Sequence, residues 1–320
     1  MDDEFSKIQW LTSRFDLSKD RNDHASGVLI GVGDDGAVLE AGERATVVTV
    51  DAQVEGVHFR SNMLSYEALG RRAVIAAASD VWAMGARPSV AVIALTFPSA
   101  FEDSDFRAII EGADAGARAS GARIAGGNLS QAPALTITTT VLGELVEQPL
   151  SRSGAAVGDS IYVTGTLGSA GLGLAALESA GSKKTTADPF IDRWRKPPTH
   201  GDFVTRLADV ATAAIDVSDG CLQDLAHLCD ASSVGAVIRV GSLPYDEGYA
   251  ETCRARGLDA ARLALTAGED YEILFCARPG ASVPSSATAI GEITRGRGVR
   301  AIDDRGDTIE FDGMGYRHFS

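Results

Sequence analysis

The chain has 320 residues, of which 45% are apolar and 23% are charged, and its formal net charge is −15 at pH 7. This composition is typical of a globular protein with an apolar core, and the acidic surplus argues against a nucleic-acid groove, which needs Lys and Arg. No apolar run approaches the ~18 residues that span a membrane, and the start of the chain lacks the order of a secretory signal, so we expect a cytoplasmic protein with no membrane or nucleic-acid partner.

The first half of the chain alternates strand-like and helix-like segments. Apolar or β-branched runs predict strands at residues 28–32, 45–50, 90–97 and 135–145, the second of which ends at Asp51. A helix is expected at 66–84, with Ser65 as its N-cap and Gly85 just beyond its end, and another at 106–120. A short run at 123–125 leads into Gly126-Gly127-Asn128.

Pro, Ser and Gly accumulate around residues 149–158, which predicts a boundary between an N-terminal domain at 1–148 and a C-terminal domain at 149–320. The second half opens with a strand at 160–164 and a helix to about 177, followed by a polar stretch at 181–198. Strands at 213–217, 236–240 and 272–276, a helix at 222–229 and a terminal hairpin around Asp304-Arg305-Gly306 complete it. This order predicts an α/β protein of two domains with mixed sheets.

Acidic residues recur where apolar runs end, next to Gly or other small residues. They are found at 33–36, at Asp51, at Asp80, at 216–220 and at 268–270. A single Asp in such a place is commonly a turn former or a helix cap. Taken together, oxygen-rich turns on a rigid scaffold favour a site for a hard cation such as Mg²⁺.

Other chemistries have little support in the sequence. There is no G-x-x-x-x-G-K-[ST] loop, no G-x-S-x-G elbow and no H-E-x-x-H motif. The glycine-rich turn at 165–171 differs in spacing from a dinucleotide-binding G-x-G-x-x-G. The four cysteines form no C-x-x-C pair, which favours reduced, mostly buried thiols.

Several segments, in order along nearly the whole chain, resemble the thiamine-monophosphate kinase family. This family belongs to a superfamily with aminoimidazole ribonucleotide synthetase and selenophosphate synthetase. The superfamily shares acidic turns such as S-D-V-W-A-M-G-A at 79–86 and D-V-S-D-G at 216–220. The segments V-E-G-V-H-F at 54–59, G-E-D-Y-E at 268–272 and G-Y-R-H-F at 315–319 are similar to the thiamine-monophosphate branch in particular.

The resemblance implies a fold like that of aminoimidazole ribonucleotide synthetase, with N-terminal strands that pair across a homodimer and a cleft that holds ATP and several Mg²⁺ ions. The positions that match metal ligands are Asp35, Thr49, Val50, Asp51, Asp80, Asn128, Asp216 and Asp219. Those that match ATP contacts are Gly127, Asn128, Arg152 and Ser218, and those that match the thiamine monophosphate site are His58, Glu269 and Tyr316. The implied activity is phosphorylation of thiamine monophosphate by ATP.

The chemistry of the residues agrees with this implication. The chain has only five lysines, so metal ions rather than ammonium groups would neutralise a triphosphate. The acceptor phosphate is already anionic at neutral pH and needs no strong general base, so we expect direct in-line transfer without a phospho-enzyme. No single acid or base residue is therefore expected to be catalytic.

Two departures from the family pattern concern one metal. The family usually has Asp where this chain has Asn128 and Thr where it has Val50, and the loss of a ligand charge weakens a cation site. These departures leave open a nucleotide-binding protein of weakened activity. Another phosphoryl-transfer activity of the superfamily also stays open, although selenophosphate synthetases carry a reactive residue near the N-terminus and this chain has no cysteine before Cys221.

Overall fold

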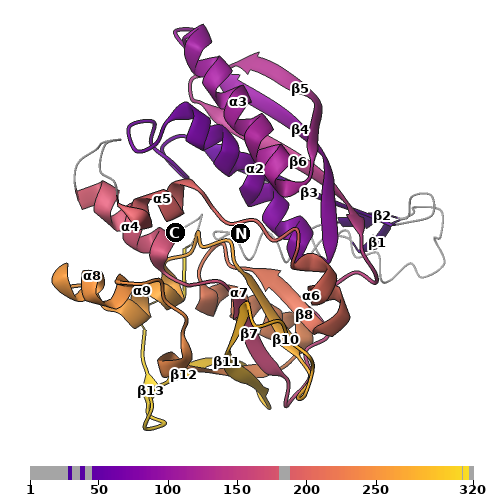
Figure 1. Cartoon of the computed structure of the whole chain (residues 1–320), viewed down its shortest axis with the longest axis vertical. Helices are drawn as coiled ribbons and strands as arrows, with labels where there is room; N and C mark the ends of the chain where they lie inside the picture. Colours follow the sequence, from indigo (N-terminus) through magenta and orange to yellow (C-terminus); the bar gives the residue numbers. More distant parts are fainter. Residues whose placement is uncertain (1–27, 31–36, 40–44, 180–187, 312, 317–320) are drawn as a thin grey trace, which may run out of the picture.

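The structure is a computed structural model, and it describes residues 28–30, 37–39, 45–179, 188–311 and 313–316. Two β-sheets, each with its own helices, lie one above the other in Figure 1. The strands of the first sheet fall between residues 28 and 145, and those of the second between 160 and 309. The chain is thus an α/β protein with two mixed sheets, as the sequence predicted.

The first sheet has six strands in the order β1-β2-β3-β6-β4-β5. Only the β4–β5 pair is parallel, and the other neighbouring pairs are antiparallel. Helices α2 and α3 cover one face of this sheet (Figure 1). The elements are β1 (Val28–Ile30), β2 (Ala37–Leu39), β3 (Thr46–Val54), α2 (Tyr66–Ala83), β4 (Ala86–Phe97), α3 (Asp103–Ser120), β5 (Arg123–Gln131) and β6 (Thr136–Leu145).

The second sheet has seven strands in the order β13-β12-β9-β11-β7-β10-β8, and only β9 and β12 run parallel. Its strands are β7 (Ser160–Thr164), β8 (Ala211–Asp216), β9 (Gly235–Arg239), β10 (Ile273–Ala277), β11 (Ala287–Thr294), β12 (Gly298–Ile302) and β13 (Thr308–Ile309). Its helices are α4 (Ser169–Ser179), α5 (Pro189–Arg195), α6 (Val204–Val210), α7 (Cys221–Ser232), α8 (Tyr249–Ala255) and α9 (Ala260–Thr266), with a 3₁₀ turn at Val240–Ser242.

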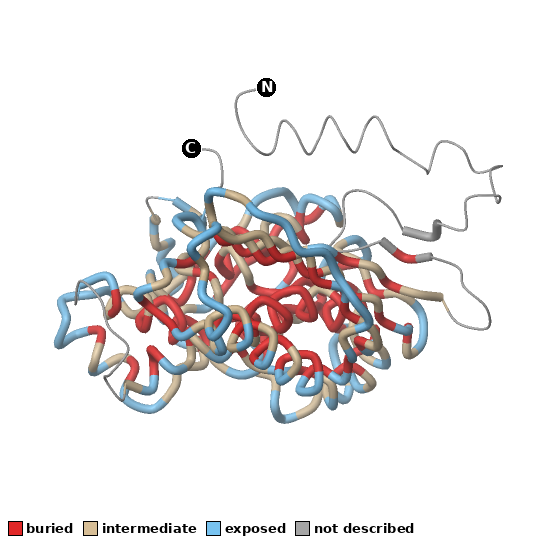
Figure 2. Tube along the Cα trace, turned by 90° about the horizontal axis from the view of Figure 1, so that it is seen from above, coloured by how far each residue is buried: buried red, intermediate tan, exposed pale blue. Residues whose placement is uncertain are grey.

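Helix α2 lies between the two sheets and is buried on nearly all sides. Thirteen of its eighteen residues are buried, whereas a surface helix buries only one stripe. Ile75 and Trp82 contribute to a core cluster with Phe275 of the second sheet, while Val74 packs in a separate cluster with Ile109 of α3. Figure 2 shows this continuous buried interior. Because α2 belongs to both interiors, it fixes the two halves of the molecule to each other.

Most expected elements are present, with three corrections. The strand expected at 45–50 does not end at Asp51 but continues through it to Val54, because Asp51 pairs in register with Thr139 of β6. The run at 123–125 extends to Gln131 as β5, paired with β4. The helices α6, α8 and α9, which are seven residues each, and the strands β2 and β11 were not expected.

The cap, the hairpin and the cysteines follow the sequence analysis. The Ser65 hydroxyl accepts a hydrogen bond from the Ala68 N–H at 3.1 Å and caps α2. Strands β12 and β13 form the terminal hairpin. The four cysteines are free and buried. Among the described residues, no helix is both long and apolar enough to cross a membrane.

The close approach of α2 and α3 depends on glycines. A Cβ at Gly112 would lie 1.9 Å from the Glu67 carbonyl oxygen, and one at Gly70 would lie 2.0 Å from that of Ile109. Both contacts are with helix backbone, which cannot rotate away. The two helices can therefore pack at this distance only because neither glycine has a side chain.

We expect Gly112→Ala to destabilise the protein, although alanine is normally the better helix former. Overpacking should lower the free energy of unfolding by about 1–3 kcal/mol, measured by urea denaturation. Gly201→Ala is the control, because a Cβ there meets nothing within 4 Å. A Gly112→Ala protein as stable as the wild type would contradict the packing described here.

Candidate functional site

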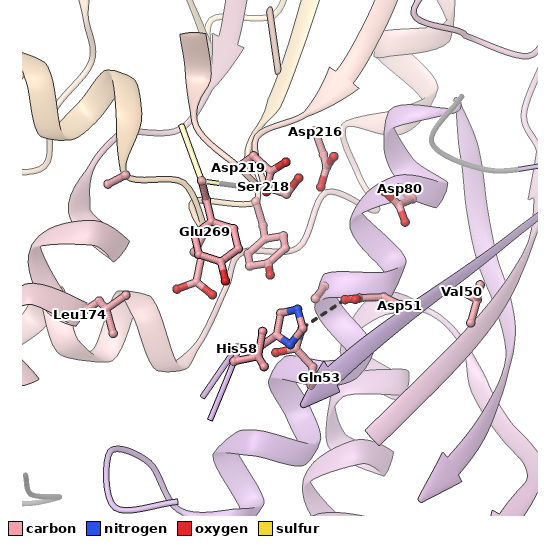
Figure 3. Close-up of a pocket in the computed structure, with 15 residues that line it drawn as sticks. Val50, Asp51, Gln53, His58, Asp80, Leu174, Asp216, Ser218, Asp219 and Glu269 are labelled. Carbon is pink, nitrogen blue, oxygen red and sulfur yellow. Dashed lines mark hydrogen bonds between the residues drawn. The ribbon is translucent and has the colours of Figure 1, made fainter. Parts of the chain in front are cut away.

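A cavity of about 310 Å³ lies where α2 separates the two sheets (Figure 3). Its walls come from β3 and the turn after it, from α2, from α4, from the end of β8 and the loop after it, from the segment between α9 and β10, and from the C-terminal segment. The lining residues are Val50, Asp51, Gln53, Val57, His58, Ala76, Asp80, Leu174, Asp216, Ser218, Asp219, Ala267, Glu269, Tyr271 and Tyr316. Segments more than 250 residues apart in the chain thus meet at one site.

Many of the residues singled out from the sequence line this cavity. They are Val50, Asp51, His58, Asp80, Asp216, Ser218, Asp219, Glu269 and Tyr316. Thr49 contacts the site through its hydroxyl, which donates to the Asp80 carboxylate at 2.6 Å. Arg152 does not line the cavity, but its positive charge lowers the pKa of Asp216. Asp35 lies outside the described residues.

Gly127 and Asn128 lie elsewhere, on the edge strand β5. Asn128 is exposed, and its amide donates to the Ser130 hydroxyl at 3.0 Å. Strands β6 and β4 stand between β3 and β5, and three strand spacings amount to about 14 Å. The Asn128 position is paired with Ala94, so its side chain lies on the face of the sheet opposite α2.

The carboxylates of the cavity repel one another. Burial raises the pKa of Asp80 well above its usual range, and the charges of Asp216 and Asp51 raise it further. Burial also raises the pKa of Asp216 to about 6, against the opposing effect of the Ser79 hydroxyl, which donates to this carboxylate at 2.7 Å. Burial raises the pKa of Asp51 as well. The ionised forms are unfavourable in the cavity unless a cation is added.

The donors of this site suit Mg²⁺. All are oxygens, and two buried oxygens near Asp51, Gln53 Oε1 and Thr139 Oγ1, have no hydrogen-bond partner. Within the part of the chain that the structure describes, no three carboxylate, imidazole or thiol groups are close enough to form a complete metal site. Mg²⁺ commonly binds one or two carboxylates and takes its other ligands from water and substrate phosphates, so the residues fit such an ion.

The loop at 216–220 is held by two residues that sequence reasoning missed. The Asp224 carboxylate accepts hydrogen bonds from the backbone N–H groups of Ser218, Asp219 and Gly220 at 3.0–3.2 Å. The Gln223 amide donates to the Asp219 carboxylate and to the Tyr316 carbonyl, at 3.0 and 2.7 Å. An acidic residue in the first turn of a helix, four residues after Gly220, is the signal that would have identified Asp224.

The G-E-D-Y-E segment has an unusual backbone. Glu269 and Tyr271 have φ angles of 61° and 50°, which non-glycine residues rarely adopt. Their N–H groups donate to the carbonyls of Ser218 and Val217, each at 2.8 Å, so this segment and the loop at 216–220 support each other. Strain of this kind is typical of functional sites.

His58 is oriented by the turn that follows β3. Its Nδ1 accepts a hydrogen bond from the Val54 N–H at 3.1 Å, so a neutral ring carries its proton on Nε2. The ring lies beside Gln53 and Asp51 in Figure 3, across the cavity from Glu269. In the neutral ring, Nε2 is therefore the donor side of His58.

Comparisons with known proteins agree with this geometry. The family models of AIR synthase related proteins match residues 33–145 with their N-terminal domain and 156–304 with their C-terminal domain. The thiamine-monophosphate kinase of Aquifex aeolicus (strain VF5) is 32% identical over 90% of this chain and 92% of its own length. That of Salmonella typhimurium (strain LT2) is 35% identical over 91% and 92%.

Among solved structures, AaThiL complexed with AMPPCP and TMP matches with a TM-score of 0.87 and 30% identity, over 99% of this chain and 97% of that chain. The likeness thus extends through both sheets and the cavity between them. The chain belongs to the thiamine-monophosphate kinase family.

Proposed function

We propose that this protein transfers the γ-phosphoryl group of ATP to thiamine monophosphate and forms thiamine diphosphate, in the cytoplasm. The observation that carries this proposal is the cavity itself, which brings an acidic cluster and the G-E-D-Y-E and V-E-G-V-H-F segments together. The structural relative that is complexed with AMPPCP and TMP supports the binding of two such ligands. The buried, unpaired cysteines are compatible with a reducing compartment.

We assign the metal to the acidic side of the cavity. Asp51, Asp80, Asp216 and Asp219 would hold Mg²⁺, with the Val50 backbone and the Thr49 hydroxyl beside them. When bound, Mg²⁺ supplies positive charge that neutralises the phosphates and favours phosphoryl transfer. Thr49 and Ser79 each hold one carboxylate by a hydrogen bond, which keeps these ligands in place.

The remaining residues would bind and orient the two substrates. We assign Ser218 and Arg152 to ATP, and His58, Glu269 and Tyr316 to thiamine monophosphate. The acceptor is an anionic phosphate monoester, so the residues need only position its oxygen for in-line attack on the γ-phosphorus. This accounts for a cavity without a strong general base at its centre.

The activity is tested directly with purified protein, ATP, Mg²⁺ and thiamine monophosphate. We expect thiamine diphosphate, detected by fluorescence after oxidation, and we expect its formation to stop when EDTA removes the metal. Rapid quench with γ-labelled ATP should leave no label on the protein, because transfer is direct. Absence of product would refute the proposed activity, and a competent labelled protein would refute only the mechanism.

Asp80→Asn should separate stability from activity. Removal of one charge relieves repulsion in the empty cavity, so we expect the melting temperature without Mg²⁺ to rise. Loss of a metal ligand should lower the rate of thiamine diphosphate formation by about 10²-fold or more. Asp209→Asn, at an exposed position on α6, is the control. A variant that is less stable but fully active would contradict the assignment of Asp80.

We also propose a homodimer formed through the first sheet. On the face away from α2, cross-strand pairing aligns Val50, Thr140 and Val92 in one row. Val50 is 63% exposed and Val92 38% exposed, which is costly for apolar side chains on a sheet face. Asn128 lies on the same face. We therefore assign Gly127 and Asn128 of each protomer to the metal and the ATP in the cavity of the other protomer.

Val92→Arg should convert the dimer to a monomer, because an unpaired guanidinium is unfavourable within an apolar interface. Light scattering after size exclusion would measure the mass. Ala115→Arg, on the exposed side of α3, is the control and should leave the mass unchanged. A monomeric wild type, or a dimer that persists in Val92→Arg, would contradict this interface.

A further inference from the structure

Arg72 lies within α2 and is completely buried. Its Nη2 donates to Glu269 Oε1 and its Nη1 donates to the Trp194 carbonyl. The guanidinium also lies over two aromatic rings, 4.8 Å from the centroid of Trp194 and 5.5 Å from that of Tyr271. A buried arginine is tolerated only where its charge is paired, and Glu269 provides this pairing from the other half of the molecule.

Both oxygens of the Glu269 carboxylate are engaged by this arrangement. Oε1 accepts from Arg72, and Oε2 accepts from the Trp194 indole N–H at 2.5 Å. The backbone of Glu269, with φ at 61°, is held by the hydrogen bond from its N–H to the Ser218 carbonyl. The side chain that we assign to the acceptor site is therefore fixed from two directions.

The same helix also holds the acidic side of the cavity. Ser79 is seven residues beyond Arg72 and donates to the Asp216 carboxylate at 2.7 Å, and Asp80 follows it. Eight residues of α-helix advance by about 12 Å. Because α2 is a continuous, buried helix, it sets the separation between Glu269 and the carboxylates that we assign to the metal.

We propose that Arg72 and Trp194 are positioning residues that hold Glu269 for recognition of the phosphoryl acceptor, an inference that rests on the proposed function. Neither residue lines the cavity, so they act through Glu269. Their role differs from that of other contacts between the two halves. Arg195, which donates to the Met63 carbonyl at 2.8 and 3.2 Å, fastens α5 to the first half without contacting Glu269.

Trp194→Phe is the sharpest variant, because it keeps an aromatic ring beside Arg72 and removes the indole N–H, together with part of the buried ring volume. The two KM values, rather than stability, therefore report on the lost hydrogen bond. We expect the KM for thiamine monophosphate to rise about ten-fold, as for the loss of a hydrogen bond to a charged group, with the KM for ATP unchanged. Arg72→Met should have a larger effect of the same kind. Arg72→Lys, which keeps the charge but not the planar fork, should rescue it in part.

Arg195→Met is the matched control and should lower the melting temperature while leaving both KM values unchanged. Trp194→Phe with wild-type KM values, or with both KM values raised equally, would overturn the positioning role while the proposed activity stands. A wild-type protein that forms no thiamine diphosphate would overturn both. The KM values of Arg72→Met are interpreted together with those of Arg72→Lys, which keeps the buried charge. If Arg72→Met does not fold, Arg72→Lys and Trp194→Phe decide the outcome.

Discussion

The repulsion between carboxylates in the cavity is the constraint on which the site depends. Asp51, Asp80 and Asp216 come from three elements and face a common space, where burial disfavours their charges. The Thr49 and Ser79 hydroxyls offset only part of this cost. The rest must be offset by packing elsewhere, and α2, with its nearly complete burial, is where both cores meet. The fold thus keeps these carboxylates close together, and a bound cation would relieve the repulsion between them.

A second cost is the backbone of the G-E-D-Y-E segment. Two non-glycine residues with positive φ cost about 1–3 kcal/mol each. The Asp270 carboxylate between them accepts from the N–H groups of Gly168 and Ala170 at 2.7 and 3.2 Å, at the start of α4. This buried group, whose pKa burial raises to about 7, joins the segment to a third part of the chain. The strain is therefore offset by hydrogen bonds that also align the cavity wall.

The sequence indicated the acidic positions and the long helix, but not their spatial relations. Every second residue of β3 faces α2, as Thr49, Asp51 and Gln53 do. This period of two is typical of a strand, and it places Asp51 inside β3 rather than at its end. Arg72 is visible as a charge in an apolar helix, yet its partners are 122 and 197 residues away. Asn128 matched a motif, but the strand order that separates it from Asp51 follows from pairing that no local pattern encodes.

The composition of the cavity wall links the two ligands of the proposed function. Among the described residues that line the cavity there is no lysine or arginine, so a triphosphate would meet mainly carboxylates. The described residues also form no complete metal site of their own. The phosphates of ATP would supply the oxygen ligands that Mg²⁺ still needs, and Mg²⁺ would supply the positive charge that the triphosphate needs. In the proposed function, binding of ATP and of Mg²⁺ would then be coupled, and by thermodynamic linkage each would raise the affinity of the site for the other by the same factor.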